Sequence, residues 1–157
     1  MKKALAIAGR RALSITPTAS FADHLEPKES EIRAGGDLAH TNLSGADLSG
    51  ANLTGADLSG ARMSGVNVNG AKISGADLNG ANLRDANLRF ADLSSANLIY
   101  AILNGAKISG ADLNGANLRD ANLSGADLSG INANNLKGCP SSLPSGWVCE
   151  NNSLIKH

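Results

Sequence analysis

A five-residue period is the feature that most constrains the fold of this chain of 157 residues. It runs in phase over residues 36–135, as twenty consecutive pentapeptides. If the central residue is called i, then i is Leu in fifteen units and i−2 is Ala in sixteen, while i−1 is Asn or Asp in sixteen and i+2 is Gly in thirteen. Neither a helix nor a strand has this period. The pattern predicts short extended segments with Leu and Ala facing inward, each followed by a turn in which Gly supplies a positive φ.

Such a chain needs stacked units, because a single pentapeptide buries almost nothing. The hydrophobic content of 42% is too high for a disordered chain. With an aromatic content of only 3%, the core must be built from small aliphatic side chains. The net charge of zero argues against a general nucleic-acid binder. No apolar run approaches the roughly 20 residues of a membrane span, so we expect no transmembrane segment.

The repeat resembles the A(D/N)LXX motif of the pentapeptide-repeat family. Residues 46–55, for example, read ADLSGANLTG. The resemblance implies an all-β fold, a right-handed quadrilateral β-helix with four pentapeptides per coil and therefore about five coils over residues 36–135. At about 4.8 Å between neighbouring strands, this rod would be about 24 Å long.

Four pentapeptides per coil define four faces of the rod. Face A begins with residues 36–40, face B with 41–45, face C with 46–50 and face D with 51–55, and each face recurs every twenty residues. Residues twenty apart are then expected to stack on one another, so the face of every outward side chain follows from its number.

The family resemblance implies a non-catalytic binding or structural module that recognises a protein through a face or corner of the rod. We expect no enzyme activity, because the three histidines His24, His40 and His157 lie far apart in sequence and no nucleophile accompanies them. The chain has no phosphate-binding loop or dinucleotide fingerprint. The sequence therefore indicates no cofactor and no catalytic residues, and it leaves the identity of the protein partner open.

Three apolar residues interrupt the polar surface pattern around one corner of the rod. Ile99 and Tyr100 occupy positions i+1 and i+2 of face A, and Ile102 occupies position i−1 of face B. Exposed apolar patches often mark interfaces, so we expect a partner to bind here. The alternative is a distorted corner that folds these side chains onto itself. Phe90 lies about half a coil away and is not expected to join them.

An acidic ladder on face A is the second candidate binding feature. It consists of Asp37, Asp57 and Asp77, which the twenty-residue register stacks in one column. A flat ladder does not enclose a cation as calcium requires, so we predict no metal site. The alternative to a binding role is a solvated stripe of carboxylates.

The acidic face also bears on a different function. Some pentapeptide-repeat proteins resemble a DNA duplex in shape and charge and bind DNA gyrase, which confers quinolone resistance. Asp120 adds to the ladder and Arg119 opposes it, so the net charge of face A is −3. A DNA duplex of the same length carries about 14 charges, at one charge per ~1.7 Å. Face A thus carries far less charge than DNA of this length. A DNA-mimicking, topoisomerase-binding protein is the alternative to the binding module.

The two ends of the chain differ in composition from the repeat. Residues 1–22 combine a basic start with an apolar stretch and are interpreted as a possible signal peptide or a disordered leader. Residues 23–35 are expected to cap the first coil, with a short helix over 27–34. Residues 136–157 contain two prolines and are expected to form a capping loop.

Both cysteines of the chain, Cys139 and Cys149, lie in the C-terminal capping loop. Their spacing and the lack of a nearby His do not suit a zinc site. A disulfide between them would close a loop of about 11 residues and contribute ~2.8 kcal/mol. A disulfide and a signal peptide would both indicate export to the periplasm or the outside of a bacterial cell. The alternative is a cytoplasmic protein with two free thiols.

Overall fold

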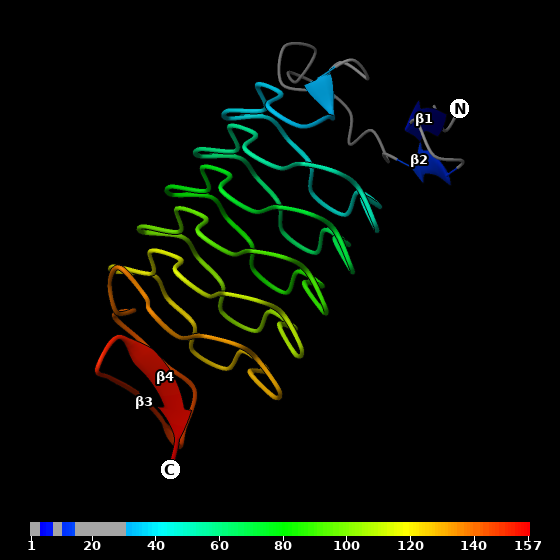
Figure 1. The fold of residues 1–157 in the computed structure, drawn as a ribbon. Coiled ribbons are helices and arrows are strands. Elements are labelled where there is room, and N and C mark those ends of the chain that lie inside the picture. The colour runs from blue at the N-terminus through cyan, green and yellow to red at the C-terminus, as the bar shows by residue number, and fades with distance from the viewer. Residues whose placement is uncertain (1–3, 8–10, 15–30) are drawn as a thin grey trace.

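The computed structural model describes residues 4–7, 11–14 and 31–157 of the chain (Figure 1). Near the N-terminus, strand β1 (Ala4–Ile7) pairs antiparallel with strand β2 (Arg11–Ser14). The rest of the leader expected at 1–22, and most of the cap expected at 23–35, lie outside the described residues. Of the expected helix over 27–34, the structure describes residues 31–34, in which bends at Ile32 and Arg33 and a turn at Ala34 follow Glu31.

The described repeat forms a solenoid in which residues twenty apart are neighbours. Parallel bridges connect these residues in an unbroken series that begins with Asp37 and Asp57 and continues to Asp112 and Asn132. Four pentapeptides therefore make one coil, and residues 36–135 make five coils, stacked along the rod in Figure 1. The register that was predicted from the family resemblance is confirmed.

Each pentapeptide except the last, residues 131–135, ends in a tight turn with one positive φ angle. The carbonyl oxygen of residue i accepts a hydrogen bond from the backbone N–H of residue i+3, as in the 3.0 Å bond between Leu48 and Ala51. Residue i+2 has a positive φ in all twenty units, which in the units that close this hydrogen bond is the signature of a type II turn. The seven i+2 residues other than Gly are His40, Asp85, Phe90, Ser95, Tyr100, Asp120 and Asn135.

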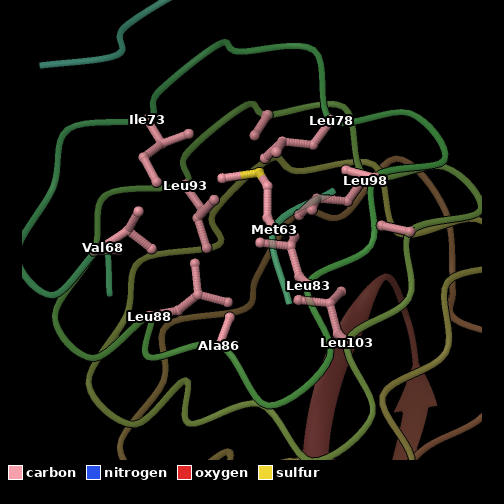
Figure 2. Close-up of a cluster of buried hydrophobic side chains, with 14 of the residues drawn as sticks. Met63, Val68, Ile73, Leu78, Leu83, Ala86, Leu88, Leu93, Leu98 and Leu103 are labelled. Carbon is pink, nitrogen blue, oxygen red and sulfur yellow. The ribbon is translucent and has the colours of Figure 1, made fainter. Parts of the chain in front are cut away.

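The core is a column of aliphatic side chains that point to the axis of the solenoid from all four faces (Figure 2). Leu83 and Leu88 are both 0% exposed, as are most of the central and i−2 residues. No polar or charged residue is buried in the described part of the chain. The residue at i−2 is small, usually Ala, and leaves room in the core for the larger side chain at i.

The C-terminal end continues the ladder for half a coil before it changes architecture. Gly138 bridges Asn117 across an offset of 21 residues, and Ser142 bridges Asn122 across an offset of 20. Strand β3 (Trp147–Glu150) then pairs antiparallel with strand β4 (Ser153–Lys156). This hairpin lies against the last coil (Figure 1).

The β3–β4 hairpin differs from the plain loop that the prolines suggested. Asn151 and Asn152 have φ angles of 47° and 58°, which form a type I′ turn that joins two strands closely. Leu154 of β4 is buried, and Leu143, Trp147 and Cys149 pack against the core. The hairpin therefore covers the end of the core, which Ala133 leaves thin. No helix within the described residues is long and apolar enough to cross a membrane.

Candidate functional site

The acidic ladder has a structural role that the sequence alone did not reveal. The side-chain oxygen of Asp57 accepts a hydrogen bond from the backbone N–H of Ser59, at 3.0 Å, and Asp77 makes the same bond to Asn79 at 3.0 Å. Asp37 accepts from Ala39 at 3.2 Å. A side-chain oxygen that accepts from the backbone two residues later forms an Asx turn. The preference for Asp or Asn at position i−1 is thus explained by the turn.

The three carboxylates lie in one column on face A, as predicted. Asp37 bridges Asp57, and Asp57 bridges Asp77. Asn97 continues the column and donates its side-chain amide to Asp77 at 3.0 Å. Among the described residues, no group of three or more His, Cys, Asp or Glu side chains is arranged to hold a metal ion. A binding role for the ladder therefore remains a prediction.

The pKa of the Asp57 carboxyl is lowered from its ordinary value of 3.8, chiefly by hydrogen bonds from Ser59 and to a smaller extent by the nearby His40. A lowered pKa in the folded state stabilises the protein above the unfolded pKa, and the contribution is lost as the pH falls through the folded value. We expect a small effect, because Asp57 is exposed.

The Asp57→Asn substitution keeps the oxygen that accepts from Ser59 but removes the titration. Relative to this variant, the wild type should therefore lose stability as the pH falls below 3.8. Urea unfolding of both proteins at neutral pH and at acidic pH measures the difference. An unchanged difference between the two proteins across this range would contradict the assigned cause.

The structure places the three predicted apolar residues around one corner. Tyr100 is 58% exposed and Ile102 is 40% exposed, whereas Ile99 is half-buried. Ile102 bridges Asn82 and Asn122, so an apolar side chain stands where the rest of its described column is polar. Two large apolar side chains are thus directed into solvent, and the corner does not fold over them.

The backbone of Tyr100 makes this exposure more notable. Its φ angle is 57°, in the left-handed region, where a residue other than Gly, Asn or Asp is disfavoured by about 1–2 kcal/mol. Gly fills this position in thirteen of the twenty units. Tyr100 therefore incurs backbone strain and gains little burial in return, and strain of this kind is concentrated at functional sites.

Phe90 shares both properties, although the sequence analysis did not include it among the candidate binding residues. It is 69% exposed and has a φ angle of 56°. Its ring lies over Gly110 of the next coil, where a Cβ atom would come within 2.6 Å of the ring. The twenty-residue register puts Phe90 on the corner between faces C and D, half a coil from Tyr100, so the two aromatic residues do not form one patch.

The two cysteines form a disulfide between the end of the ladder and the hairpin. Cys139 and Cys149 are joined across a sequence separation of ten residues. The carbonyl oxygen of Cys139 accepts a hydrogen bond from the backbone N–H of Asp120, at 3.2 Å. The disulfide therefore attaches strand β3 to the last complete coil.

A pocket of about 440 Å³ lies between the last coil and the hairpin, and sequence reasoning did not find it. Asp127 and Leu128 line one side, and Trp147 and Lys156 line the other. The pKa of Asp127 is lowered, mainly by hydrogen bonds from Ser129, so its carboxylate is charged at neutral pH. No sequence signal identifies this pocket, because it arises where the ladder stops.

Comparison with known families explains the periodicity. The family model described as pentapeptide repeats matches residues 37–70, 61–98, 71–110 and 101–135, with eight copies. These matches cover more than half of the chain. The chain belongs to the pentapeptide-repeat family. The fold of that family, a right-handed quadrilateral β-helix, has the twenty-residue coil that the bridges show here.

Solved structures of other pentapeptide-repeat proteins are similar to this one. A protein from the thylakoid lumen of Arabidopsis thaliana has 30% identity and a TM-score of 0.59, over 60% of this chain and 66% of that chain. HetL from Nostoc, a protein involved in heterocyst differentiation regulation, has 33% identity and a TM-score of 0.41, over 77% of this chain and 55% of HetL. A second Nostoc protein has 37% identity and a TM-score of 0.47, over 64% of this chain and 84% of that chain.

Of these three structures, only the Arabidopsis protein has a TM-score above 0.5, and the comparison of folds rests on it. The matched region leaves about a third of that protein and nearly half of HetL uncovered. No curated protein sequence matches the chain.

Proposed function

We propose that this pentapeptide-repeat protein is a non-catalytic module that binds a protein partner through the corner formed by Ile99, Tyr100 and Ile102. The observation that carries the proposal is the exposed ring of Tyr100, 58% accessible on a backbone with a φ angle of 57°. Ile102 extends the apolar surface onto face B. A contact that buries both side chains would offset the cost of keeping them in water.

The surroundings of the corner support an apolar contact more than an ionic one. In the next coil, Arg119 and Asp120 lie 3.9 Å apart and form an ion pair with each other. The backbone N–H of Tyr100 donates to the carbonyl oxygen of Arg119, at 3.1 Å, so the backbone of this pair adjoins that of Tyr100. Since the two charges largely neutralise each other, we expect the partner to present an apolar side chain of its own.

The test replaces Tyr100 by Gly and Ile102 by Asn, the commonest residues at their positions in the repeat. The variant should lose the partner while its folding stability rises by about 1 kcal/mol, because the strain at Tyr100 is relieved. A photo-reactive amino acid at position 100 should cross-link a partner in cells, and the double variant should not retain that partner in a pull-down.

Phe90→Gly is the matched control, since it removes an exposed aromatic residue with the same backbone conformation from another corner. This control should become more stable and keep the partner. Retention of the partner by the Tyr100→Gly, Ile102→Asn variant would refute the proposed contact.

The DNA-mimicking alternative receives less support from the charge distribution. Three carboxylates occupy the first three coils of face A, and Asn97 and Asn117 follow them in the same column. Each of the three carboxylates also accepts a backbone hydrogen bond in its own turn. Inhibition of gyrase by micromolar protein would favour this alternative over the corner contact.

We also infer that the solenoid is right-handed. The handedness follows from membership of the family.

We further infer export of the protein to an oxidising compartment. Export is supported by the disulfide between Cys139 and Cys149, because disulfides persist mainly outside the cytosol. The Arabidopsis protein of the thylakoid lumen is a family member from a non-cytosolic compartment. The intact mass of the chain from separated periplasm and cytoplasm tests both cleavage of the leader and formation of the disulfide.

A further inference from the structure

The hydrogen-bond ladder of face C stops at the last coil. Between the fourth and fifth coils, the N–H groups of Ile108 and Gly110 donate to the carbonyl oxygens of Asp127 and Ser129, at 3.0 and 2.9 Å. Asp127 in turn donates to the carbonyl oxygen of Ala106, at 2.9 Å. Each coil thus offers two donors and one acceptor to the next coil on this face.

One coil later, the same three groups have no partner. They are the N–H groups of Leu128 and Gly130 and the carbonyl oxygen of Ala126, for which residues 31–157 provide no hydrogen bond. Leu128 is only 1% exposed as a residue and lies in the lining of the pocket at this end. A buried amide without a partner is unfavourable, and native proteins rarely leave one unpaired.

Two of the other three faces, A and B, continue the ladder at this end. On face A, the N–H of Leu118 donates to Gly138, and on face B the N–H of Leu123 donates to Ser142. On face D the ladder also stops, because the N–H groups of Ala133 and Asn135 and the carbonyl oxygen of Ile131 have no backbone hydrogen bond within residues 31–157. Strand β4 is attached to this face instead, where the carbonyl oxygen of Ala133 accepts from the N–H of Leu154 at 3.1 Å. Residues 126–130 of face C make no backbone hydrogen bond to residues 136–157.

The pocket of about 440 Å³ lies at this open edge. Its first wall is the unpaired segment of the last coil, residues 126–130, and its second wall contains Pro144, Ser145, Trp147 and Lys156. Three residues that line this space, Ala126, Leu128 and Gly130, thus carry the unpaired backbone groups, and Pro144 and Trp147 line it as well.

We propose that this pocket binds an extended peptide segment of a partner protein, which adds the missing face-C strand in parallel orientation. One residue of the peptide donates its N–H to the carbonyl oxygen of Ala126 and accepts from the N–H of Leu128. The carbonyl oxygen two residues later accepts from the N–H of Gly130. This is β-augmentation, in which main-chain bonds supply affinity and side-chain pockets supply specificity.

The ladder itself indicates which side chain the peptide carries over Asp127. Where an Asn follows an Asp by twenty residues on faces A, C and D, its amide donates to that carboxylate. The three pairs are Asn97 with Asp77 at 3.0 Å, Asn67 with Asp47 at 3.0 Å, and Asn132 with Asp112 at 3.1 Å. Asp127 occupies the same position at the open edge of face C. The peptide is therefore expected to carry Asn at this register, between small or apolar neighbours.

The sole tryptophan of the chain, Trp147, provides a direct readout of the pocket. The probe is the peptide acetyl-Ala-Asn-Leu-Ser-Gly-amide, which has the sequence of residues 121–125. Added to the full, oxidised chain, it should change the Trp147 fluorescence in a saturable manner. Hydrogen exchange of the Leu128 and Gly130 amides should slow by at least about tenfold, whereas exchange at Ile108 and Gly110 should not change.

Two peptide controls and one protein control isolate the mode of binding. A peptide methylated on the Asn backbone nitrogen cannot donate to Ala126 and should not bind. A peptide with Ala in place of Asn should bind about tenfold more weakly. The Tyr100→Gly variant should bind the probe as the wild type does, which separates this pocket from the corner site. The proposal is overturned if millimolar probe leaves Trp147 and the two amides unaffected, or if the methylated peptide binds equally well.

Discussion

Replacement of Leu83 by Ala should lower the free energy of unfolding by about 2–5 kcal/mol. Leu83 is 0% exposed and lies in the centre of the column, between Met63 and Leu103 of the adjacent coils (Figure 2). The backbone ladder holds the coils at a fixed spacing, so the structure cannot collapse into the cavity that Ala leaves. In a solenoid, a defect in a middle coil weakens its interfaces with both neighbours.

Urea unfolding followed by circular dichroism measures this loss, and Arg84→Ser is the matched control. Arg84 is the next residue, and Ser is common at its position in the repeat. The hydrogen bond from the backbone N–H of residue 84 to Asn82, 3.2 Å long, does not require the arginine side chain. The control should change the free energy of unfolding by about 0.5 kcal/mol or less. A loss below about 1 kcal/mol for Leu83→Ala would mean that the core is not closely packed.

The same regularity explains why the body of the fold was predictable from the sequence. Leu at i and Ala at i−2 identify the inward side of every unit, and Gly at i+2 identifies the turn. The resemblance to a known family supplied the number of units per coil, and the bridge between Asp37 and Asp57 confirms it. The reason for Asp or Asn at i−1 needed coordinates, because the sequence shows the preference but not the hydrogen bond that the backbone N–H of Ser59 donates to the carboxylate of Asp57.

The C-terminal end was less predictable, because there the repeat no longer determines the geometry. The offset between Asn117 and Gly138 is 21 residues, and the extra residue alters the ladder on this face. The N–H groups of Leu118 and Asp120 donate to the consecutive residues Gly138 and Cys139, whereas the acceptors in the coil before lie two residues apart. The hairpin turn has Asn151 and Asn152 instead of the more familiar Asn-Gly pair. Pro140 and Pro144 suggested a loop, and they do precede the hairpin, but they do not exclude strands after them.

The candidate sites also differ in whether the sequence could predict them. Tyr100 and Ile102 were recognisable because they interrupt a pattern, and the structure shows both exposed. The open edge at Leu128 follows the pattern fully, and its N–H is unpaired only because of what comes twenty residues later. A site of this kind is determined by the end of a repeat, and the composition of the repeat does not reveal it.

Loss of the disulfide should destabilise the C-terminal cap by ~2.8 kcal/mol, the value expected for a loop of about 11 residues. An isolated two-stranded hairpin is marginally stable in water, so β3 and β4 depend on their attachments to the solenoid. The backbone attachments are few: Leu154 donates to Ala133 at 3.1 Å, and Leu136 donates to Asn152 at 2.8 Å. The bond between Cys139 and Cys149 adds a covalent attachment to these.

The double substitution Cys139→Ser and Cys149→Ser should therefore open the cap before the solenoid unfolds, because distant coils of a repeat protein are only weakly coupled. Hydrogen exchange should accelerate about 100-fold at the Leu154 amide, the factor that corresponds to ~2.8 kcal/mol, and should change little at Leu58 in the second coil. Reduction of the wild type should reproduce the effect of the double variant. Equal acceleration at Leu58 and Leu154 would show that the chain unfolds as one cooperative unit, and an unchanged rate at Leu154 would show that packing of Leu154 and Trp147 alone holds the cap.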